Sequence, residues 1–494
     1  MSNSLKASKT GLAVVERTRQ RLGWTKTNTS RWWESAHTSR ATLRRFWQGE
    51  RIQRDIFIAI CEAVGISNWE EIAEPETLDS DPKPNHTTSQ IHWQEAPDID
   101  SFFGRTQELE QLHNWSITQQ CKLIAIIGIG GIGKTALTLA LADRIQDNFH
   151  CLIWRTFTHS PSLLSVLHSL LATFNQTPVP DIHQAINEII NNLQQRRCLV
   201  ILDGLETVIH TSEYSQFISQ LSCQRHQSCI IITSRQQPPN LDFDGQTIRC
   251  LPLQGLAKAA ALELLQSRGL TGQKVGISAL IQLYRGNPLA LKIVTPLIQS
   301  VFGGNIAEFL NQNTLVMGDR LRQILHQQLQ PLSPLERDIL YWLAIWQQPI
   351  SFPRLQTHFL ISPDPGAVLE AITSLEHRSL LEKWYHLESS SFTLQPLVMK
   401  AVTDELVDRA AAEIQQVVQS QDMAHFQVLR THWLLRPGTD DIVGDRILHH
   451  LRDKLWRLYG ATLPETLEKI LLLLTDKPPI AIGYISHNLI ALLN

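Results

Sequence analysis

The stretch CKLIAIIGIGGIGKTALTLALADRI, residues Cys121–Ile145, joins an apolar run to a helical pattern through a glycine-rich turn. Residues Gly128–Thr135 match the phosphate-binding loop pattern GxxxxGK[ST]. Glycines let backbone N–H groups turn inward around phosphates without Cβ clashes, and the N-terminus of the following helix adds partial positive charge. A strand before the loop and a helix after it are the context that this motif requires. The stretch therefore predicts a site for the phosphates of a nucleotide.

The side chains of this loop indicate how the nucleotide would be held. Lys134 would reach the β- and γ-phosphates, and the hydroxyl of Thr135 would be a ligand of Mg²⁺. We therefore predict that ATP or ADP binds here together with Mg²⁺. The loop residues expected to bind it are Gly128, Gly130, Gly131, Ile132, Gly133, Lys134, Thr135 and Ala136. The alternative interpretation is a chance glycine-rich turn.

Apolar runs around the loop predict a sheet. The runs KLIAIIG, HCLIWRTF, RCLVILDG and SCIIITS alternate with segments of helix length, which is typical of a parallel sheet covered on both faces. Asp203 ends the third run, where P-loop NTPases carry the Asp that orients Mg²⁺; the alternative is a turn residue at a strand end. The next residue is Gly204, and Glu206 lies two positions too far along the chain to serve as the acid that positions water. We therefore predict nucleotide binding with, at most, slow ATP hydrolysis.

A basic residue ends the fourth apolar run. Arg235 follows CIIITS at the carboxyl edge of the predicted sheet, where ligands bind in parallel α/β folds. We predict that Arg235 contacts the γ-phosphate and forms the catalytic group together with Lys134 and Asp203. A solvated arginine at a strand end is the alternative.

Composition favours folded domains and a separate N-terminal module. Of the 494 residues, 43% are apolar and 18% are charged, and the net charge of -3 excludes a general attraction to nucleic acid. The distribution is uneven, because residues 1–60 carry 12 basic and 4 acidic side chains, whereas residues 61–100 carry 1 and 10. Such a basic segment followed by an acidic one is typical of a distinct module and its connection.

The chain shows no signal for export or for a membrane. Its seven cysteines are odd in number and form no CxxC pair, which favours reduced core thiols. No apolar stretch reaches the roughly 18 residues of a membrane span, and no secretory signal precedes the folded part. The histidines show no metal-ligand spacing beside cysteines. We therefore expect a cytoplasmic protein without a membrane partner.

Several motifs occur together in a recognisable order. They are FFGRTQELEQLHNW, GIGGIGKT, LIWRTF, LVILDG, IIITSR, LPLQGL and RGNPLALKIV. Over about residues 95–405 this series resembles the NB-ARC family, which belongs to the STAND class of signalling ATPases. The resemblance implies that Phe103, Gly104 and Arg105 lie near the adenine and that Arg235 is the first sensor arginine. It also implies that Gly286, Pro288 and Leu289 match the GLPLA motif, in which the proline packs on the base. Asn287 stands where that motif often has Leu.

The resemblance also implies the fold of the remaining chain and a mechanism. A helical domain and a winged helix follow the ATPase core in this family and close over ADP, and exchange for ATP opens them and exposes an oligomerising surface. Gln395 stands at the position of the His that holds the β-phosphate of ADP, and it can donate a hydrogen bond but carries no charge. A homo-oligomer in the ATP state is therefore an expected partner.

The resulting fold class is multidomain α/β: a P-loop NTPase parallel sheet, a helical domain and a winged helix, with an all-α N-terminal domain like a helix-turn-helix. Predicted boundaries are residues 1–75 for the N-terminal domain, 76–98 for a linker, 99–252 for the NTPase, 253–318 for the helical domain, 319–408 for the winged helix and 409–494 for a C-terminal helical region.

The basic head has its own pattern. Leu43, Phe46 and Trp47 are spaced to face a core, Gly49 ends their helix, and Phe57, Ile60, Cys61 and Val64 form a second stripe. This pattern resembles the helix-turn-helix of the XRE type, although His37 replaces the glycine of the turn. The resemblance implies DNA contacts by Arg40, Thr42, Arg44 and Arg45 in the major groove. A protein-interaction domain built on the same helices is the alternative.

The tail ends in an apolar stripe, LPETLEKILLLLTDKPPIAIGYISHNLIALLN. This stripe fits either burial against the preceding helices or a docking surface. Because no repeat array follows, we expect either a short form or a sensor or effector on another chain. A nucleotide-controlled DNA-binding transcription regulator and a nucleotide-filled scaffold are the alternatives to the switch.

Overall fold

The computed structural model describes residues 4–25, 30–36, 38, 40–74, 90–93, 95–99, 101–157, 160–243, 245–270, 274–312, 315–386, 389–435 and 446–493. The chain divides into two compact units, Met1–His86 and Thr87–Asn494. Each unit has its own hydrophobic core.

The first unit is helical, with a short two-stranded sheet. Its elements are β1 (Ser4–Leu5), α1 (Lys9–Arg21), α2 (Ser30–Ser35), α3 (Arg40–Trp47), β2 (Ile52–Gln53), α4 (Arg54–Ala63) and the 3-10 turn η1 (Trp69–Glu71). The predicted stripe of α4 is confirmed, because Phe57, Ile60, Cys61 and Val64 are all buried. Gly49 has a φ of 69° just beyond α3, which is the left-handed conformation that ends helices. His37 lies outside the described residues.

The second unit begins with a parallel sheet in the order β3-β5-β6-β7-β4-β8. Its strands are β3 (Gln90–His92), β4 (Leu123–Ile127), β5 (Cys151–Thr156), β6 (Cys198–Asp203), β7 (Cys229–Ser234) and β8 (Ile248–Pro252). Every residue of β4, β6 and β7 is buried. The four predicted apolar strands are therefore confirmed as β4, β5, β6 and β7.

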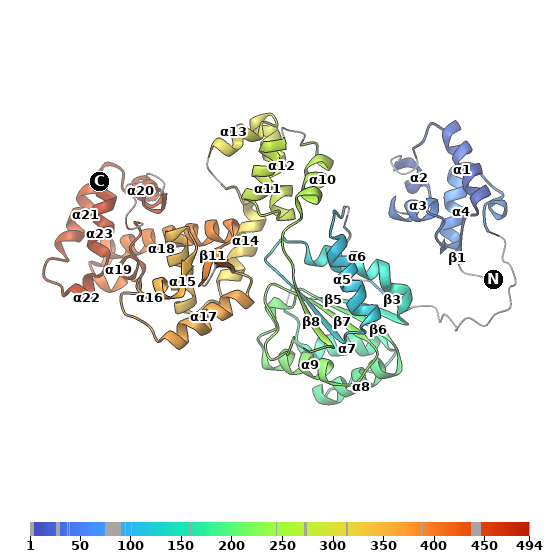
Figure 1. Cartoon of the computed structure of the whole chain (residues 1–494), viewed down its shortest axis with the longest axis horizontal. Coiled ribbons are helices and arrows are strands. Elements are labelled where there is room, and N and C mark those ends of the chain that lie inside the picture. Colours follow the sequence, from blue (N-terminus) through green and yellow to red (C-terminus); the bar gives the residue numbers. More distant parts are fainter. Residues whose placement is uncertain are drawn as a thin grey trace. The chain divides into compact units, whose positions relative to one another are not determined.

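Helices cover both faces of this sheet (Figure 1), as continuous apolar strands require. The helices α7, α8 and α9 contribute to the core on one face, and α5 and α6 to the core on the other. Their bounds are α5 (Thr106–His113), α6 (Lys134–Ile145), α7 (Leu163–Thr173), α8 (Ile182–Gln195) and α9 (Ser212–Cys223). A π-helical turn, η2 (Asn114–Thr118), continues α5.

A helical segment follows the sheet, and its apolar side chains share one core with the regions that come after it in the chain. Its helices are α10 (Lys258–Ser267), α11 (Lys274–Leu283), α12 (Pro288–Phe302) and α13 (Ile306–Asn311). We use "helical segment" for residues 253–317, which contain these four helices.

The next region is mainly helical and carries a small antiparallel sheet. It contains α14 (Gly318–Leu329), α15 (Pro334–Trp346), β9 (Ile350–Ser351), α16 (Phe352–Gln356), α17 (Pro365–His377), β10 (Leu381–His386), β11 (Ser389–Leu394) and α18 (Pro396–Ser420). Strands β10 and β11 pair antiparallel and form a hairpin. Strand β9 completes a three-stranded sheet by pairing with β11.

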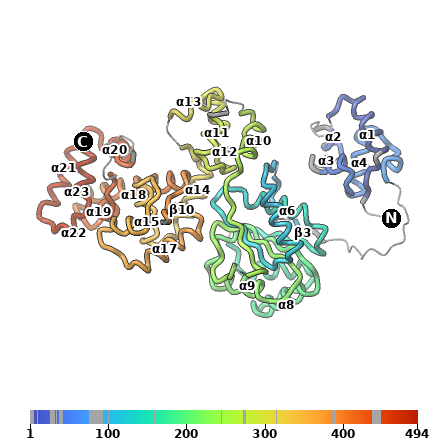
Figure 2. Tube along the Cα trace, in the orientation of Figure 1, coloured from blue at the N-terminus to red at the C-terminus, as the bar shows by residue number. Residues whose placement is uncertain are grey.

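The tail is helical, as predicted, and Figure 2 shows its last helices gathered together. They are α19 (Val428–Thr431), α20 (Arg446–Tyr459), α21 (Leu463–Leu472), α22 (Pro479–Ile482) and α23 (Ile485–Leu493). Ile485, Leu489 and Leu492 are buried, so the terminal stripe packs against neighbouring helices. None of the described helices combines the length and the apolar character that crossing a bilayer demands.

Two predicted boundaries differ from the structure. Strand β3 lies inside the predicted linker 76–98 and pairs with β5. The sequence did not predict it, because a strand of three residues gives no detectable periodicity. Residues 76–89 and 94 of that linker lie outside the described residues. The boundary predicted at 408/409 falls in the middle of α18, because the helical pattern continues through it without a break.

Candidate nucleotide site

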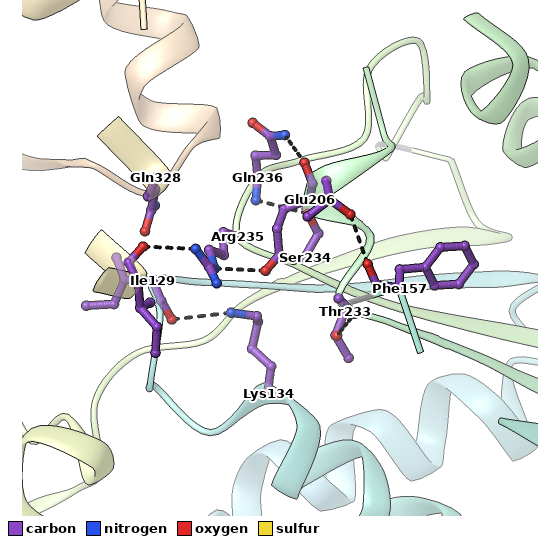
Figure 3. Close-up of polar contacts among 12 residues, drawn as sticks. Ile129, Lys134, Phe157, Glu206, Thr233, Ser234, Arg235, Gln236 and Gln328 are labelled. Carbon is purple, nitrogen blue, oxygen red and sulfur yellow. Dashed lines mark hydrogen bonds and ion pairs between the residues drawn. The ribbon is translucent and has the colours of Figure 1, made fainter. Parts of the chain in front are cut away.

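The phosphate-binding loop lies between β4 and α6, as predicted. Gly133 has a φ of 101° and immediately precedes α6. The ammonium of Lys134 is buried and donates to the carbonyls of Gly128 (2.7 Å) and Ile129 (3.3 Å), so it folds back over the loop (Figure 3). Burial lowers the pKa of Lys134 to about 8. A buried ammonium held only by carbonyls favours an anionic ligand.

The carbonyl groups of the loop from Gly128 to Ile132 all accept hydrogen bonds. Lys134 occupies the first two. The carboxamide of Asn287 donates to Gly130 O (3.2 Å), and the N–H of Leu289 donates to Gly131 O (3.3 Å). The guanidinium of Arg105 donates to Ile132 O (3.0 Å). Since peptide N–H groups point opposite to their carbonyls, this arrangement turns the N–H groups toward an anion.

Thr135 and Asp203 meet at the end of β6, as predicted for the Mg²⁺ site. The Thr135 hydroxyl donates to Asp203 Oδ1 (2.9 Å), and the Thr233 hydroxyl donates to the same oxygen (2.5 Å). Burial raises the pKa of Asp203, while these two hydrogen bonds oppose that shift. A hydroxyl and a carboxylate side by side are the hard oxygen ligands that suit Mg²⁺ with nucleotide phosphates. The residues present therefore fit the predicted ion.

Arg235 lies at the carboxyl edge of β7 and joins two elements (Figure 3). Its Nε lies 2.8 Å from Glu206 Oε1, and its Nη1 donates to the carbonyl of Ile324 in α14 (2.9 Å). Glu206, which lies two positions too far along the chain for the expected water-positioning acid, is nevertheless next to Arg235. Gly204 has a φ of 80° and starts a 3-10 turn, η4 (Leu205–Thr207), that brings Glu206 back beside Arg235.

Glu206 retains one unused acceptor. Its Oε2 is buried and has no hydrogen-bond partner within the part of the chain that the structure describes. The carboxamide of Gln236 donates to the Glu206 backbone carbonyl (3.1 Å) and so fixes the turn. A buried carboxylate oxygen without a donor is costly unless a ligand or water supplies one. Glu206 is therefore a site residue that the sequence interpretation set aside.

The residues predicted to lie near the base surround a pocket of about 140 Å³ beside the loop. Those lining it are Phe103, Arg105, Gly131, Ile132, Gly133, Ala136, Pro288 and Leu289. Leu264 of α10 and Lys292 of α12 also line it and had not been predicted. Gly104 lies against the helical segment, because a Cβ there would come within 2.3 Å of the Ala260 side chain.

Helix α14 covers the loop from the other side. A Cβ on Gly130 would lie 2.0 Å from Cγ2 of Ile324, so the two residues are packed without spare room. Gln395, predicted to hold the β-phosphate, is half-buried directly before α18 and does not line the pocket. The described packing of α14 on the loop is made by Ile324 against Gly130. The sequence interpretation missed this residue.

The residues predicted to contact DNA lie on α3. Arg44 and Arg45 are exposed, and Thr42 is half-buried. The guanidinium of Arg45 pairs with Glu50 (3.0 Å) and also donates to the carbonyl of Arg51 (3.2 Å). Arg40 begins the helix, and its side chain lies outside the described residues.

Comparisons with known proteins agree with this site. Residues 105–274 match the model of the NB-ARC domain family. The match confirms the predicted resemblance over the nucleotide-binding region, and the parallel sheet with its covering helices agrees with a P-loop NTPase fold.

Relatives were found in a cyanobacterium and a plant. The chain is 31% identical to an uncharacterized WD repeat-containing protein of Nostoc sp., over 99% of this chain and 46% of that protein. It is 25% identical to a disease resistance-like protein of Arabidopsis thaliana, over 39% of this chain and 16% of that protein. The chain thus spans less than half the length of both relatives. Among solved structures, a Walker-type ATPase of Pyrococcus abyssi gives a TM-score of 0.44 at 13% identity, over 61% of this chain and 96% of its own.

The tight contact between Gly130 and Ile324 gives a first prediction. Gly130→Ala should lower the midpoint of thermal unfolding, because overpacking typically costs about 1–3 kcal/mol. The double variant Gly130→Ala with Ile324→Ala should recover part of this loss, since the second change removes the clashing methyl group. Thermal unfolding followed by circular dichroism would measure both. Purely additive effects in the double variant would contradict the packing of α14 on the loop.

Proposed function

We propose that the chain is an ATP- and ADP-binding molecular switch of the NB-ARC, STAND type, with slow hydrolysis. The observation that carries this proposal is the position of Arg235. Its guanidinium pairs with Glu206 at the edge of the sheet and donates to Ile324 of α14, which also covers the loop. One side chain at the nucleotide edge therefore ties the ATPase core to the following region.

The proposed switch follows from competition for Arg235. In the ADP state the guanidinium remains on the carbonyl of Ile324, and α14 stays closed over the loop. A γ-phosphate attracts the same guanidinium more strongly than a neutral carbonyl does, because the hydrogen bond is then assisted by charge on both sides. Binding of ATP therefore weakens the bond to α14 and shifts the balance toward an open state.

The proposed hydrolysis uses the residues around β6. Asp203 and Thr135 would hold Mg²⁺, which neutralises charge on the β- and γ-phosphates. Lys134 leaves the loop carbonyls for the phosphates. The unpartnered Oε2 of Glu206 is placed to accept a proton from the attacking water. The other oxygen of Glu206, Oε1, lies 2.8 Å from Arg235 Nε, and this pairing holds the carboxylate beside the nucleotide edge.

We further propose that opening exposes a surface for self-association and that a sensor or effector contributes the signal. One support is the match to less than half of a relative whose name records WD repeats. The described cysteines are all free thiols, which agrees with a site of action in the cytoplasm.

Nucleotide binding is tested by releasing the co-purifying ligand under denaturing conditions and separating it by chromatography. We expect about one ADP or ATP per chain. Lys134→Ala should weaken ADP binding by about 10- to 100-fold, since it removes a charge-assisted hydrogen bond to phosphate. The same variant should lose ATP-dependent oligomerisation, measured by light scattering. An unaltered chain that neither carries nor binds nucleotide would overturn the proposal.

Hydrolysis is tested at Glu206. Glu206→Gln should lower single-turnover ATP hydrolysis by about 100-fold, the contribution typical of a general base. ADP affinity should change far less, because the amide keeps the shape of the side chain. Glu213→Gln, on the exposed first turn of α9, is the matched control and should hydrolyse ATP at the unaltered rate. Equal rates for Glu206→Gln and the control would remove Glu206 from the mechanism.

The second candidate function is DNA binding by the first unit, with nucleotide as effector. It is favoured by the exposed side chains of Arg44 and Arg45 on α3, a helix whose Leu43 and Phe46 are buried in the core of the first unit. In this case Arg44→Ala should weaken binding to duplex DNA and reduce its salt dependence by about one ion. Arg21→Ala, exposed at the end of α1, is the control. Fluorescence anisotropy across a salt series would measure both, and the absence of any duplex binding would exclude this function.

A further inference from the structure

The N-terminus of α12 is bonded to the phosphate-binding loop, with a partner for each of its first donors. Pro288, the first residue of the helix, has no N–H. The N–H of Leu289 donates to Gly131 O (3.3 Å) and that of Ala290 donates to Asn287 Oδ1 (3.1 Å). Helix N-termini leave such donors unpaired unless caps or other segments supply acceptors. Here the phosphate-binding loop supplies one of these acceptors, the carbonyl of Gly131.

Asn287 has a second bond that capping does not require. Its Nδ2 donates to Gly130 O (3.2 Å), while its Oδ1 caps the helix. The side chain is buried, with 1% of its surface exposed. Both ends of one carboxamide are therefore used, one within the helical segment and one on the loop.

We infer that Asn287 is a positioning residue for the phosphates. A trans peptide is planar, and its N–H points opposite to its carbonyl. Drawing the Gly130 carbonyl toward Asn287 therefore turns the Gly131 N–H toward the side where an anion binds. Gly131 has a φ of 77°, a conformation that glycine adopts without a steric penalty, so hydrogen bonds to the adjoining peptide decide how it is oriented. Without the donor, the buried Gly130 carbonyl would be left unpaired, and the peptide would be free to rotate.

This inference rests on the proposed nucleotide site and adds a coupling to it. If Asn287 orients the loop for phosphate, docking of the helical segment increases phosphate affinity. By thermodynamic reciprocity, a bound phosphate then strengthens the docking by the same factor. The base pocket and the phosphate loop would in this way be tied through one helix N-terminus.

The experiment separates the donor from the cap. Asn287→Thr keeps a capping oxygen and nearly the same volume but cannot also reach Gly130 O. Asn287→Asp keeps the shape and the cap, and places an acceptor where the donor was. Asn305 of α13 is the matched control, since its side chain also caps a helix, accepting from Glu308 N–H (3.2 Å). Affinities for ADP and for adenosine, measured by competition with a fluorescent ADP analogue, are compared with the unfolding midpoint of the nucleotide-free chain.

We expect Asn287→Thr to weaken ADP about tenfold, as for one lost hydrogen bond to a buried group, and to leave adenosine within about twofold. Asn305→Thr should leave both affinities unchanged and should shift the unfolding midpoint only slightly, because its side chain is exposed. An equal loss of ADP and adenosine, or no loss of ADP, would overturn the inference. Asn287→Asp carries the same test should Asn287→Thr fail to fold. An unaltered chain that binds neither ligand would instead overturn the nucleotide site itself.

Discussion

A phosphate-binding loop binds an anion only when its peptide N–H groups face the ligand. In this chain, hydrogen bonds to the carbonyl groups of the same peptides fix the direction of those N–H groups. Five successive carbonyls, from Gly128 to Ile132, are held by Lys134, Asn287, Leu289 and Arg105. The last three donors come from segments far from the loop in sequence. The anion site is therefore a property of the folded unit, and the motif alone does not create it. Packing of the helical segment and shaping of the loop are one event.

Two contacts between the edge of the sheet and α14 explain how a bound nucleotide could control the region that follows the helical segment. Arg235 reaches both Glu206 and the carbonyl of Ile324, so one side chain joins the carboxyl edge of the sheet to α14. Ile324 also fills the space above Gly130. The bond and the packing contact lie on the same turn of α14, and the release of one weakens the other. Two-state behaviour is expected of such tight contacts, because packed surfaces do not deform gradually.

The features that could be predicted from the sequence are those set by the spacing of residues close together in the chain. The loop, the strands that end at Asp203 and Ser234, and the buried stripe of α4 each follow from the pattern of a few neighbouring residues. Glu206 and Ile324 could not be predicted in this way. The left-handed Gly204 turns Glu206 back toward the strand, and no periodicity records such a turn. Asn287 was noticed as a departure from a motif, yet its bond to Gly130 depends on tertiary packing. Gln395 was placed by motif order alone, whereas the pocket beside the loop has no lining from that region.

Helix α18 has a mechanical consequence. It runs unbroken through 25 residues, Pro396–Ser420, which corresponds to a rod about 37 Å long. It follows directly on β11, and near its end the carboxylate of Glu413 accepts the N–H groups of Val428 and Leu429 at the start of α19 (2.7 and 3.1 Å). A tilt of about 10° at the first turn would carry the far end through about 6 Å. A small rotation at the start of α18, beside the three-stranded sheet, would thus become a larger displacement of the C-terminal helices bonded near its far end.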